Sequence, residues 1–242
     1  WGDYLAQGRR RSPHTVRAYV AAAARILDDK ADTDWPVIAR LDAGALRGQL
    51  AMRRAEGIGN VSAARELSAL KSFIAFARSQ AGLPDPAPPR MRGPRIKKGL
   101  PRPVTPDEAV GLAHAVAEDA SEPWIGARDR AVLLLLYGAG MRIAEALSLT
   151  GGVLPLGEVL TVTGKGGKQR VVPLLPIVRD GVADYASQCP WPLSRDTPLF
   201  RGAKGGTLSQ GMVQKAVARA RIVLGLPASA TPHALRHSFA TH

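Results

Sequence analysis

The chain has 242 residues with 33 Lys and Arg against 20 Asp and Glu, which gives a formal net charge of +13. A hydrophobic fraction of 45% supports one large domain or two ordinary ones, and the positive charge favours a polyanionic partner. A ribosomal or membrane-surface protein would share this charge, so it indicates only a class. An aromatic content of 5% argues against binders that stack single-stranded bases and favours duplex backbone.

Both halves of the chain are basic, because residues 1–93 carry 15 Lys and Arg against 9 Asp and Glu and residues 94–242 carry 18 against 11. We therefore expect the partner to touch both. A single cysteine, Cys189, excludes an internal disulfide, and no secretory leader opens the chain, so we expect a cytoplasmic protein. The longest apolar run, Ala131 to Tyr137, is far shorter than the ~20 residues that span a bilayer, so we expect no membrane partner.

The first 83 residues have helical patterns. Ser12 and Pro13 form an N-cap and first helical residue, and a second helix fits Ala43 to Ala55 with Gly57 as its stop. A third helix begins after Ser62, and its predicted buried side is apolar at Leu67, Leu70, Phe73, Ile74 and Ala77.

Another face of this third helix carries Arg65, Ser68 and Lys71. Arg65 and Lys71 fit either an ordinary solvated face or a helix that lies in a DNA groove. We favour the groove only because of the motifs that follow.

Residues 84–103 contain seven of the 19 prolines and six basic residues against the single acidic Asp85. This composition predicts an extended linker, either a plain solvated tether or a strap along a phosphate backbone. We therefore expect an N-terminal helical domain at 1–83, the linker at 84–103, and a second domain at 104–242.

The second domain opens with a capping box, because Thr105 is followed by proline and then by Glu108 at the third helical position. A long helix is predicted from Arg128 to Tyr137. Glycines then break it, and a short helix carries Arg142 and Glu145 three residues apart on one face.

A β-hairpin is predicted next, with strands at 158–163 and 169–173 joined by glycines around Lys165. Taken alone, this basic tip fits an everyday solvated turn. It is not a Walker loop, because that motif requires Ser or Thr after Gly-Lys and then a helix, whereas Gln169 and a strand follow here.

Ser209 opens another helix, on which Lys215 and Arg219 lie one turn apart, and Thr231 with Pro232 caps the last one. His233 and Arg236 then lie in its first turns, where free N–H groups favour an anion. His233 and His237 have the spacing of a zinc pair, but they lack an acidic partner and a cysteine cluster, so we expect no metal. The fold class predicted is mainly α with a small β-hairpin, in two domains.

Arg142, Lys165, His233 and Arg236 together have the chemistry of DNA strand transfer. A phosphodiester under attack gathers negative charge on its non-bridging oxygens, and planar guanidinium forks match that charge better than any other side chain. A lysine and a histidine can then move the protons.

The order and contexts of these motifs resemble the tyrosine recombinase (phage integrase) family, and most closely the Xer recombinases of bacteria. They are Gly140-Met141-Arg142-Ile143-Ala144-Glu145, the glycine-rich tip at 164–168, and His233-Ala234-Leu235-Arg236. The N-terminal segments 12–19 and 69–74 are similar to the DNA-clamping helices of that family, and Leu100-Pro101-Arg102-Pro103 to its linker.

This resemblance implies that Arg142 and Arg236 bind the scissile phosphate, that Lys165 is the general acid to the leaving 5′ oxygen, and that His233 assists proton transfer at the nucleophile. Glu145 would support the first arginine. No cofactor is expected, because a phosphotyrosyl linkage conserves the phosphoester energy. The further DNA contacts expected are Arg65, Lys71, Lys168, Arg170, Lys215 and Arg219.

The family places a second His or Trp and then the nucleophilic tyrosine downstream of His-x-x-Arg, whereas the printed chain stops at His242. The resemblance implies a two-domain DNA clamp, with a DNA-binding domain at 1–83 and a catalytic domain at 104–242 whose C-terminal part is missing. We therefore expect this chain to lack the nucleophile and to be inactive in cleavage. The implied function is site-specific recombination in a homo- or heterotetramer on paired duplex sites, resolving chromosome dimers at cell division. The alternatives are a phage or transposon integrase, a type IB topoisomerase, and a DNA-binding protein without catalysis.

Overall fold

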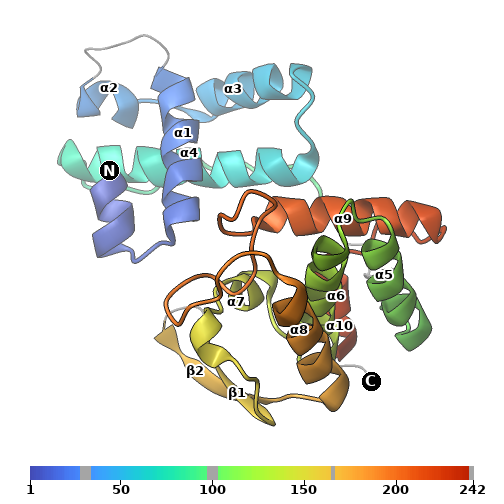
Figure 1. The fold of residues 1–242 in the computed structure, drawn as a ribbon. Helices are drawn as coiled ribbons and strands as arrows, with labels where there is room; N and C mark the ends of the chain where they lie inside the picture. Colours follow the sequence, from blue (N-terminus) through green and yellow to red (C-terminus); the bar gives the residue numbers. More distant parts are fainter. Residues whose placement is uncertain (28–33, 97–102, 165–166, 240–242) are drawn as a thin grey trace. The chain divides into compact units, whose positions relative to one another are not determined.

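The computed structural model describes residues 1–27, 34–96, 103–164 and 167–239. The chain divides into two compact units, Trp1–Gly99 and Leu100–His242. The described residues form ten α-helices, two short helical turns and one two-stranded antiparallel sheet, which confirms the mainly α fold with a small hairpin (Figure 1).

In the first unit, α4 (Asn60–Gln80) is the central helix. The helices α1 (Pro13–Leu27), α2 (Trp35–Ala39) and α3 (Ala43–Ala55) all pack against it, and α1 crosses it in Figure 1. The five apolar residues predicted to form its inner face are all buried. The helix begins three residues earlier than expected, because Gly59 is its extended N-cap and accepts a backbone hydrogen bond from Ala63 at 3.0 Å.

Sequence patterns did not predict two short elements of this unit, the π-helical turn η1 (Tyr4–Gly8) and α2. Aromatic side chains hold both of them against α4. The Tyr4 ring lies 4.8 Å from that of Phe76, and Trp35 packs edge-on at 5.3 Å from the same ring. Contacts between segments that are far apart in the sequence produce no local hydrophobic pattern, so these two elements could not be predicted from periodicity.

The described part of the proline-rich segment, residues 84–96, lies against α4. Lys71 donates its Nζ hydrogen to the carbonyl oxygen of Met91 at 2.6 Å, Asn60 donates to the carbonyl of Arg95 at 3.0 Å, and Arg78 donates to that of Ala87. The first compact unit therefore continues past residue 83. Residues 97–102 of the segment lie outside the described residues.

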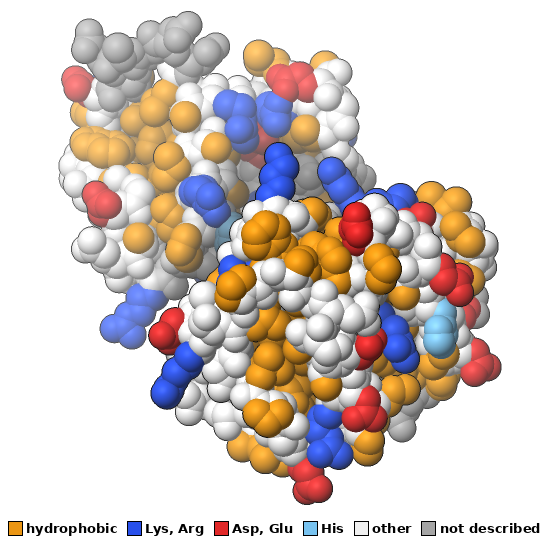
Figure 2. All heavy atoms as spheres, viewed as in Figure 1, with side chains coloured by type: hydrophobic (Ala, Val, Ile, Leu, Met, Phe, Trp, Pro, Cys, Tyr) orange, Lys and Arg blue, Asp and Glu red, His pale blue; other side chains and the backbone are white. Residues whose placement is uncertain are grey.

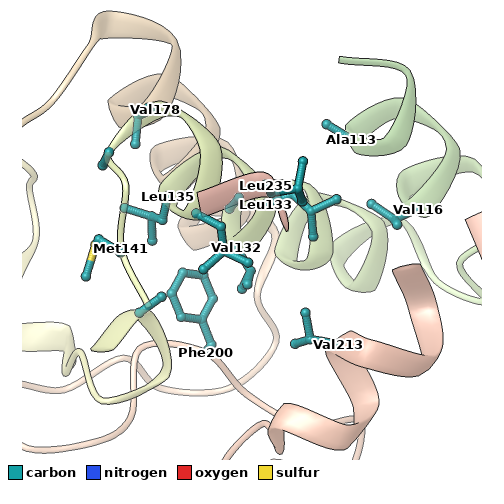
Figure 3. Close-up of a cluster of buried hydrophobic side chains, with 14 of the residues drawn as sticks. Ala113, Val116, Val132, Leu133, Leu135, Met141, Val178, Phe200, Val213 and Leu235 are labelled. Carbon is teal, nitrogen blue, oxygen red and sulfur yellow. The ribbon is translucent and has the colours of Figure 1, made fainter. Parts of the chain in front are cut away.

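The second unit contains α5 (Pro106–Glu118), α6 (Pro123–Gly138), α7 (Ile143–Leu147), the 3-10 turn η2 (Gly151–Val153), β1 (Val159–Thr163), β2 (Gln169–Pro173), α8 (Pro176–Gln188), α9 (Gln210–Val223) and α10 (Pro232–Phe239). Helix α6 is its centre and packs against α5, α8 and α10. Figure 3 shows Val132, Leu133 and Leu135 of α6 among apolar side chains from the surrounding helices.

Helix α6 begins five residues before the expected Arg128, because Pro123 occupies the first turn of the helix, where proline is favoured. Arg128 and Asp129 are therefore interior residues and form a buried ion pair at 2.8 Å. Arg128 also donates to the carbonyl oxygen of Arg201 at 2.8 Å, which fastens the segment before α9 to the central helix. Burial raises the pKa of Asp129, and the charge and hydrogen bonds of Arg128 oppose that rise.

The hairpin has the predicted strands, paired from Val159 opposite Pro173 to Thr163 opposite Gln169. Leu160, Val162 and Val172 point into the core, whereas Val159 and Val171 are exposed. This alternation fixes which face of the hairpin meets the rest of the unit.

Candidate active site

The turn between α6 and α7 presents Arg142. Gly140 lies in the left-handed region at φ +58°, and the Met141 side chain is buried. Arg142 follows in extended conformation as the N-cap of α7. Its backbone is therefore fixed, while its side chain is 50% exposed and able to reach a ligand.

Glu145 lies beneath Arg142 with only 5% of its side chain exposed. One oxygen accepts from the backbone N–H of Arg142 at 2.8 Å, and the other accepts from Arg142 Nη1 at 2.7 Å. Arg170 of β2 adds two hydrogen bonds, from Nη1 at 2.9 Å and from Nη2 at 2.7 Å. The hydrogen bonds from Arg170, followed by those from Arg142, lower the pKa of Glu145 to about 2 although burial opposes them. Glu145 is therefore ionised at neutral pH.

Helix α10 presents His233 and Arg236. The Thr231 hydroxyl accepts from the backbone N–H of Ala234 at 3.2 Å, which caps the helix as predicted. Arg236 is half-buried, and its Nε donates to the carbonyl oxygen of Gly140 at 3.0 Å. This bond ties α10 to the turn that carries Arg142.

Arg142, His233 and Arg236 line one groove in the second unit. Partial burial lowers the pKa of His233, and the positive charges of His237, Arg236 and Arg142 lower it further. The neutral imidazole, which can accept a proton, is therefore favoured. The Nε2 atoms of His233 and His237 lie 2.9 Å apart, so one ring donates to the other.

Helix α9 supplies groove residues that were not predicted from the sequence. Gln214, Val217, Ala218 and Arg221 line the groove, and their spacing of three and four residues places them on one helical face. The predicted contacts Lys215 and Arg219 lie outside this set. The helical spacing of residues 210–223 would group these four residues on one face of α9, but it would not show that this face lies opposite Arg142 and His233.

The hairpin meets the site through Glu145. Lys165 and Gly166 lie outside the described residues, so the position of the predicted general acid is not part of the structure. On either side of them, Gly164 donates its backbone N–H to the carbonyl of Lys168 at 2.7 Å. The Lys168 side chain is exposed.

The six expected DNA contacts fall into two groups. Arg65, Lys168 and Lys215 are exposed. Lys71 donates to the carbonyl of Met91, Arg170 pairs with Glu145, and Arg219 pairs with Asp119 at 2.6 Å. Figure 2 shows that on the face drawn Lys and Arg side chains are scattered over each unit among apolar ones.

Within the part of the chain that the structure describes, no three or more His, Cys, Asp or Glu side chains gather as a metal ion would require. None of the described helices combines the length and apolar character needed to cross a membrane.

Comparison with known proteins agrees with this fold and site. Residues 102–242 match the model of the phage integrase family, and residues 1–81 match the model of the phage integrase N-terminal SAM-like domain. The chain therefore belongs to the phage integrase family of tyrosine recombinases, as its motifs predict.

Curated relatives place it among proteins of XerC type. The chain is 48% identical to tyrosine recombinase XerC of Brucella suis biovar 1 (strain 1330), with 100% of this chain and 79% of the relative covered. It is 44% identical to tyrosine recombinase XerC of Rhodospirillum centenum (strain ATCC 51521 / SW), with 100% and 73% covered. Among solved structures, a lambda integrase tetramer bound to a Holliday junction matches with a TM-score of 0.69 at 18% identity, covering 99% of this chain and 66% of that one.

Proposed function

We propose that this protein is a site-specific recombinase that cuts and rejoins duplex DNA through a 3′-phosphotyrosyl intermediate. Its family makes it an enzyme that breaks and rejoins DNA strands. The observation that carries the finer proposal is the single groove lined by Arg142, His233 and Arg236, which come from elements almost a hundred residues apart.

In this proposal, each residue has a distinct task. Arg142 and Arg236 bind the non-bridging oxygens of the scissile phosphate, where charge grows in the transition state. His233 accepts the proton of the attacking hydroxyl, a role that suits a neutral imidazole. Lys165 donates a proton to the leaving 5′ oxygen. The covalent intermediate keeps the energy of the phosphoester bond, so rejoining needs no nucleotide cofactor.

None of the four described tyrosines lines the groove, which argues against each of them as the nucleophile. Tyr185 is buried, its hydroxyl donates to the carbonyl of Leu199 at 2.9 Å, and burial raises its pKa. Burial also raises the pKa of Tyr137. We therefore assign the nucleophile to a tyrosine outside residues 1–242.

We further propose that the protein resolves chromosome dimers in the cytoplasm, by strand exchange in a homo- or heterotetramer on paired sites. Its similarity to tyrosine recombinases named XerC supports recombination as its activity. The structural neighbour that was solved as a tetramer on a Holliday junction supports the tetramer. An integrase of the same chemistry remains the second candidate. A recombination assay separates the two candidates. A dimer-resolving recombinase should exchange strands between two identical sites, whereas an integrase should insert one DNA molecule into another.

The test is covalent trapping on a nicked duplex, from which the short fragment that bears the new 5′ hydroxyl dissociates after cleavage. Residues 1–242 should shift the duplex in a native gel and give no protein-linked band in a denaturing gel. A form that carries the family's downstream tyrosine should give that band. A band from residues 1–242 would show that the nucleophile is assigned wrongly. If neither form gives a band although both bind, the protein is a DNA-binding protein without this catalysis.

A further inference from the structure

The Arg170 guanidinium is directed at a carboxylate of its own chain. Nη1 and Nη2 of Arg170 each meet a different oxygen of Glu145, which is the bidentate geometry that a guanidinium forms with a carboxylate. The two residues are 25 positions apart, on β2 and α7. A side chain expected from its sequence position to contact DNA is thus engaged next to the groove.

Glu145 uses its hydrogen-bonding capacity on two arginines. Each of its oxygens accepts one bond from Arg142 and one from Arg170. A buried carboxylate needs such partners, because leaving it without them carries a large desolvation cost. If Arg170 were absent, Arg142 alone among these partners could satisfy Glu145.

The net charge of the Glu145 cluster also depends on Arg170. Arg142, Glu145 and Arg170 together carry a net charge of +1, whereas Arg142 and Glu145 alone would be neutral. Of these three residues Arg142 is the one that lines the groove, and half of its side chain is exposed, so within this cluster its charge is the one that a phosphate in the groove would meet. Arg170 therefore decides how much of the Arg142 charge is left for that phosphate.

We propose that Arg170 is a positioning residue for strand cleavage. By taking two of the four hydrogen bonds of Glu145, it leaves the Arg142 guanidinium bound to that carboxylate through Nη1 alone, so that its other N–H groups can bind the scissile phosphate. This inference rests on the proposed function. Two other roles of Arg170 are possible in principle, a direct contact with DNA and a structural link between the hairpin and α7. Only the positioning role makes the effect of Arg170 depend on the charge of the scissile phosphate.

The experiment compares Arg170→Met and Arg170→Lys in a form that carries the nucleophilic tyrosine. Lys204→Met is the matched control, since Lys204 is an exposed cation of the same unit outside the Glu145 cluster. Single-turnover cleavage and DNA affinity are measured for each variant, and thermal melting confirms that each is folded. We expect Arg170→Met to slow cleavage by roughly 30-fold and Arg170→Lys by less, with affinity changed less than about threefold. The control should match the parent.

A second substrate separates the mechanisms. A methylphosphonate at the scissile position replaces one charged oxygen by a methyl group, so the site no longer needs the full charge of Arg142. On this neutral substrate the Arg170→Met defect should shrink to less than about threefold. This ratio is internal to each variant, so reduced folding cannot produce it.

Three results would overturn the inference. An equal defect on the charged and neutral substrates would assign Arg170 a structural role. A loss of affinity as large as the loss of rate would assign it a DNA contact. Unchanged cleavage in both variants would leave it no role. If the parent itself cleaves neither substrate, the proposed function fails first, and that outcome is recognised without any variant.

Discussion

Arg236 donates its Nε hydrogen to the carbonyl oxygen of Gly140 at 3.0 Å, a contact between residues 96 positions apart. Gly140 stands two residues before Arg142, in the turn that presents this arginine. One hydrogen bond therefore sets the last helix against the turn, and with it the spacing of the two arginines. The backbone of Gly140 and the side chain of Arg236 thus both belong to the arrangement that we propose binds the phosphate.

Gly140→Ala should destabilise the second unit. The residue has φ +58°, and a Cβ there would clash with Cδ1 of the Phe239 ring. We expect the free energy of unfolding to fall by about 1–3 kcal/mol, measured by chemical denaturation. Gly206→Ala is the control, because a Cβ at Gly206 meets open space. Equal effects of the two substitutions would contradict the assigned strain.

Glu145 should make stability depend on pH in the acid range. Its pKa is about 2 in the folded protein and 4.5 in its ordinary state, so the stabilisation is complete above pH 4.5 and is lost as pH falls towards 2. Relative to Glu145→Gln, the advantage of the parent protein should shrink by about 2 kcal/mol across this window, because solvent screens the half-exposed arginines. Urea unfolding at a series of pH values measures it. Glu118→Gln, on the exposed side of α5, is the control. A difference that stays constant with pH would refute the role of the ionised carboxylate.

DNA affinity should fall steeply with salt, by roughly 10³-fold or more between about 50 and 200 mM, because phosphate neutralisation releases counterions. Two cations on α9 form a matched pair for this measurement. Lys215 is exposed, whereas Arg219 is paired with Asp119. We expect Lys215→Met to reduce the log–log salt slope by about 1 and Arg219→Met to reduce it less. A flat salt response of the parent would remove the main support for a duplex DNA partner.

Lys165→Ala should spare DNA binding and depress cleavage in a form that carries the nucleophile. A substrate with sulfur in place of the 5′ bridging oxygen has a better leaving group and should restore much of the rate, as expected after loss of a general acid. Quenched-flow cleavage of both substrates measures the rescue. Lys168→Ala, on the same hairpin, is the control and should show no rescue. If the sulfur substrate is cleaved no faster by Lys165→Ala, Lys165 only holds the phosphate.

Local signals in the sequence were sufficient for the elements that have them. The pattern from Ala43 to Ala55 with Gly57 as its stop identifies α3, the capping box at Thr105 starts α5, and Val, Leu and Thr around a glycine-rich turn identify the strands of the hairpin. Helices α2 and α8 carry proline in their first turns but have no side-chain cap at their starts, and aromatic packing against α4 supports α2. The existence of the site could be predicted for the same reason, because its motifs are short and contiguous.

The partners of the site residues could not be predicted from the sequence. Arg170 was expected to contact DNA because the sequence shows its positive charge. Its two hydrogen bonds to Glu145 depend on how β2 packs against α7, which the sequence does not show. The bond from Arg236 to Gly140 likewise exists only once α10 meets the α6–α7 turn. Tertiary packing decides which charges are left for a ligand.

The central claim is that Arg142 and Arg236 bind one phosphate, and replacing each of them by lysine tests it most directly. A lysine keeps the charge but not the planar fork, so each variant should lose about 2 kcal/mol or more of transition-state stabilisation in single-turnover cleavage, with much less change in DNA affinity. Their defects should combine with less than full additivity, since both act on one group. If either variant cleaves at the parental rate, or if its loss is entirely a loss of DNA affinity, that arginine does not hold the scissile phosphate.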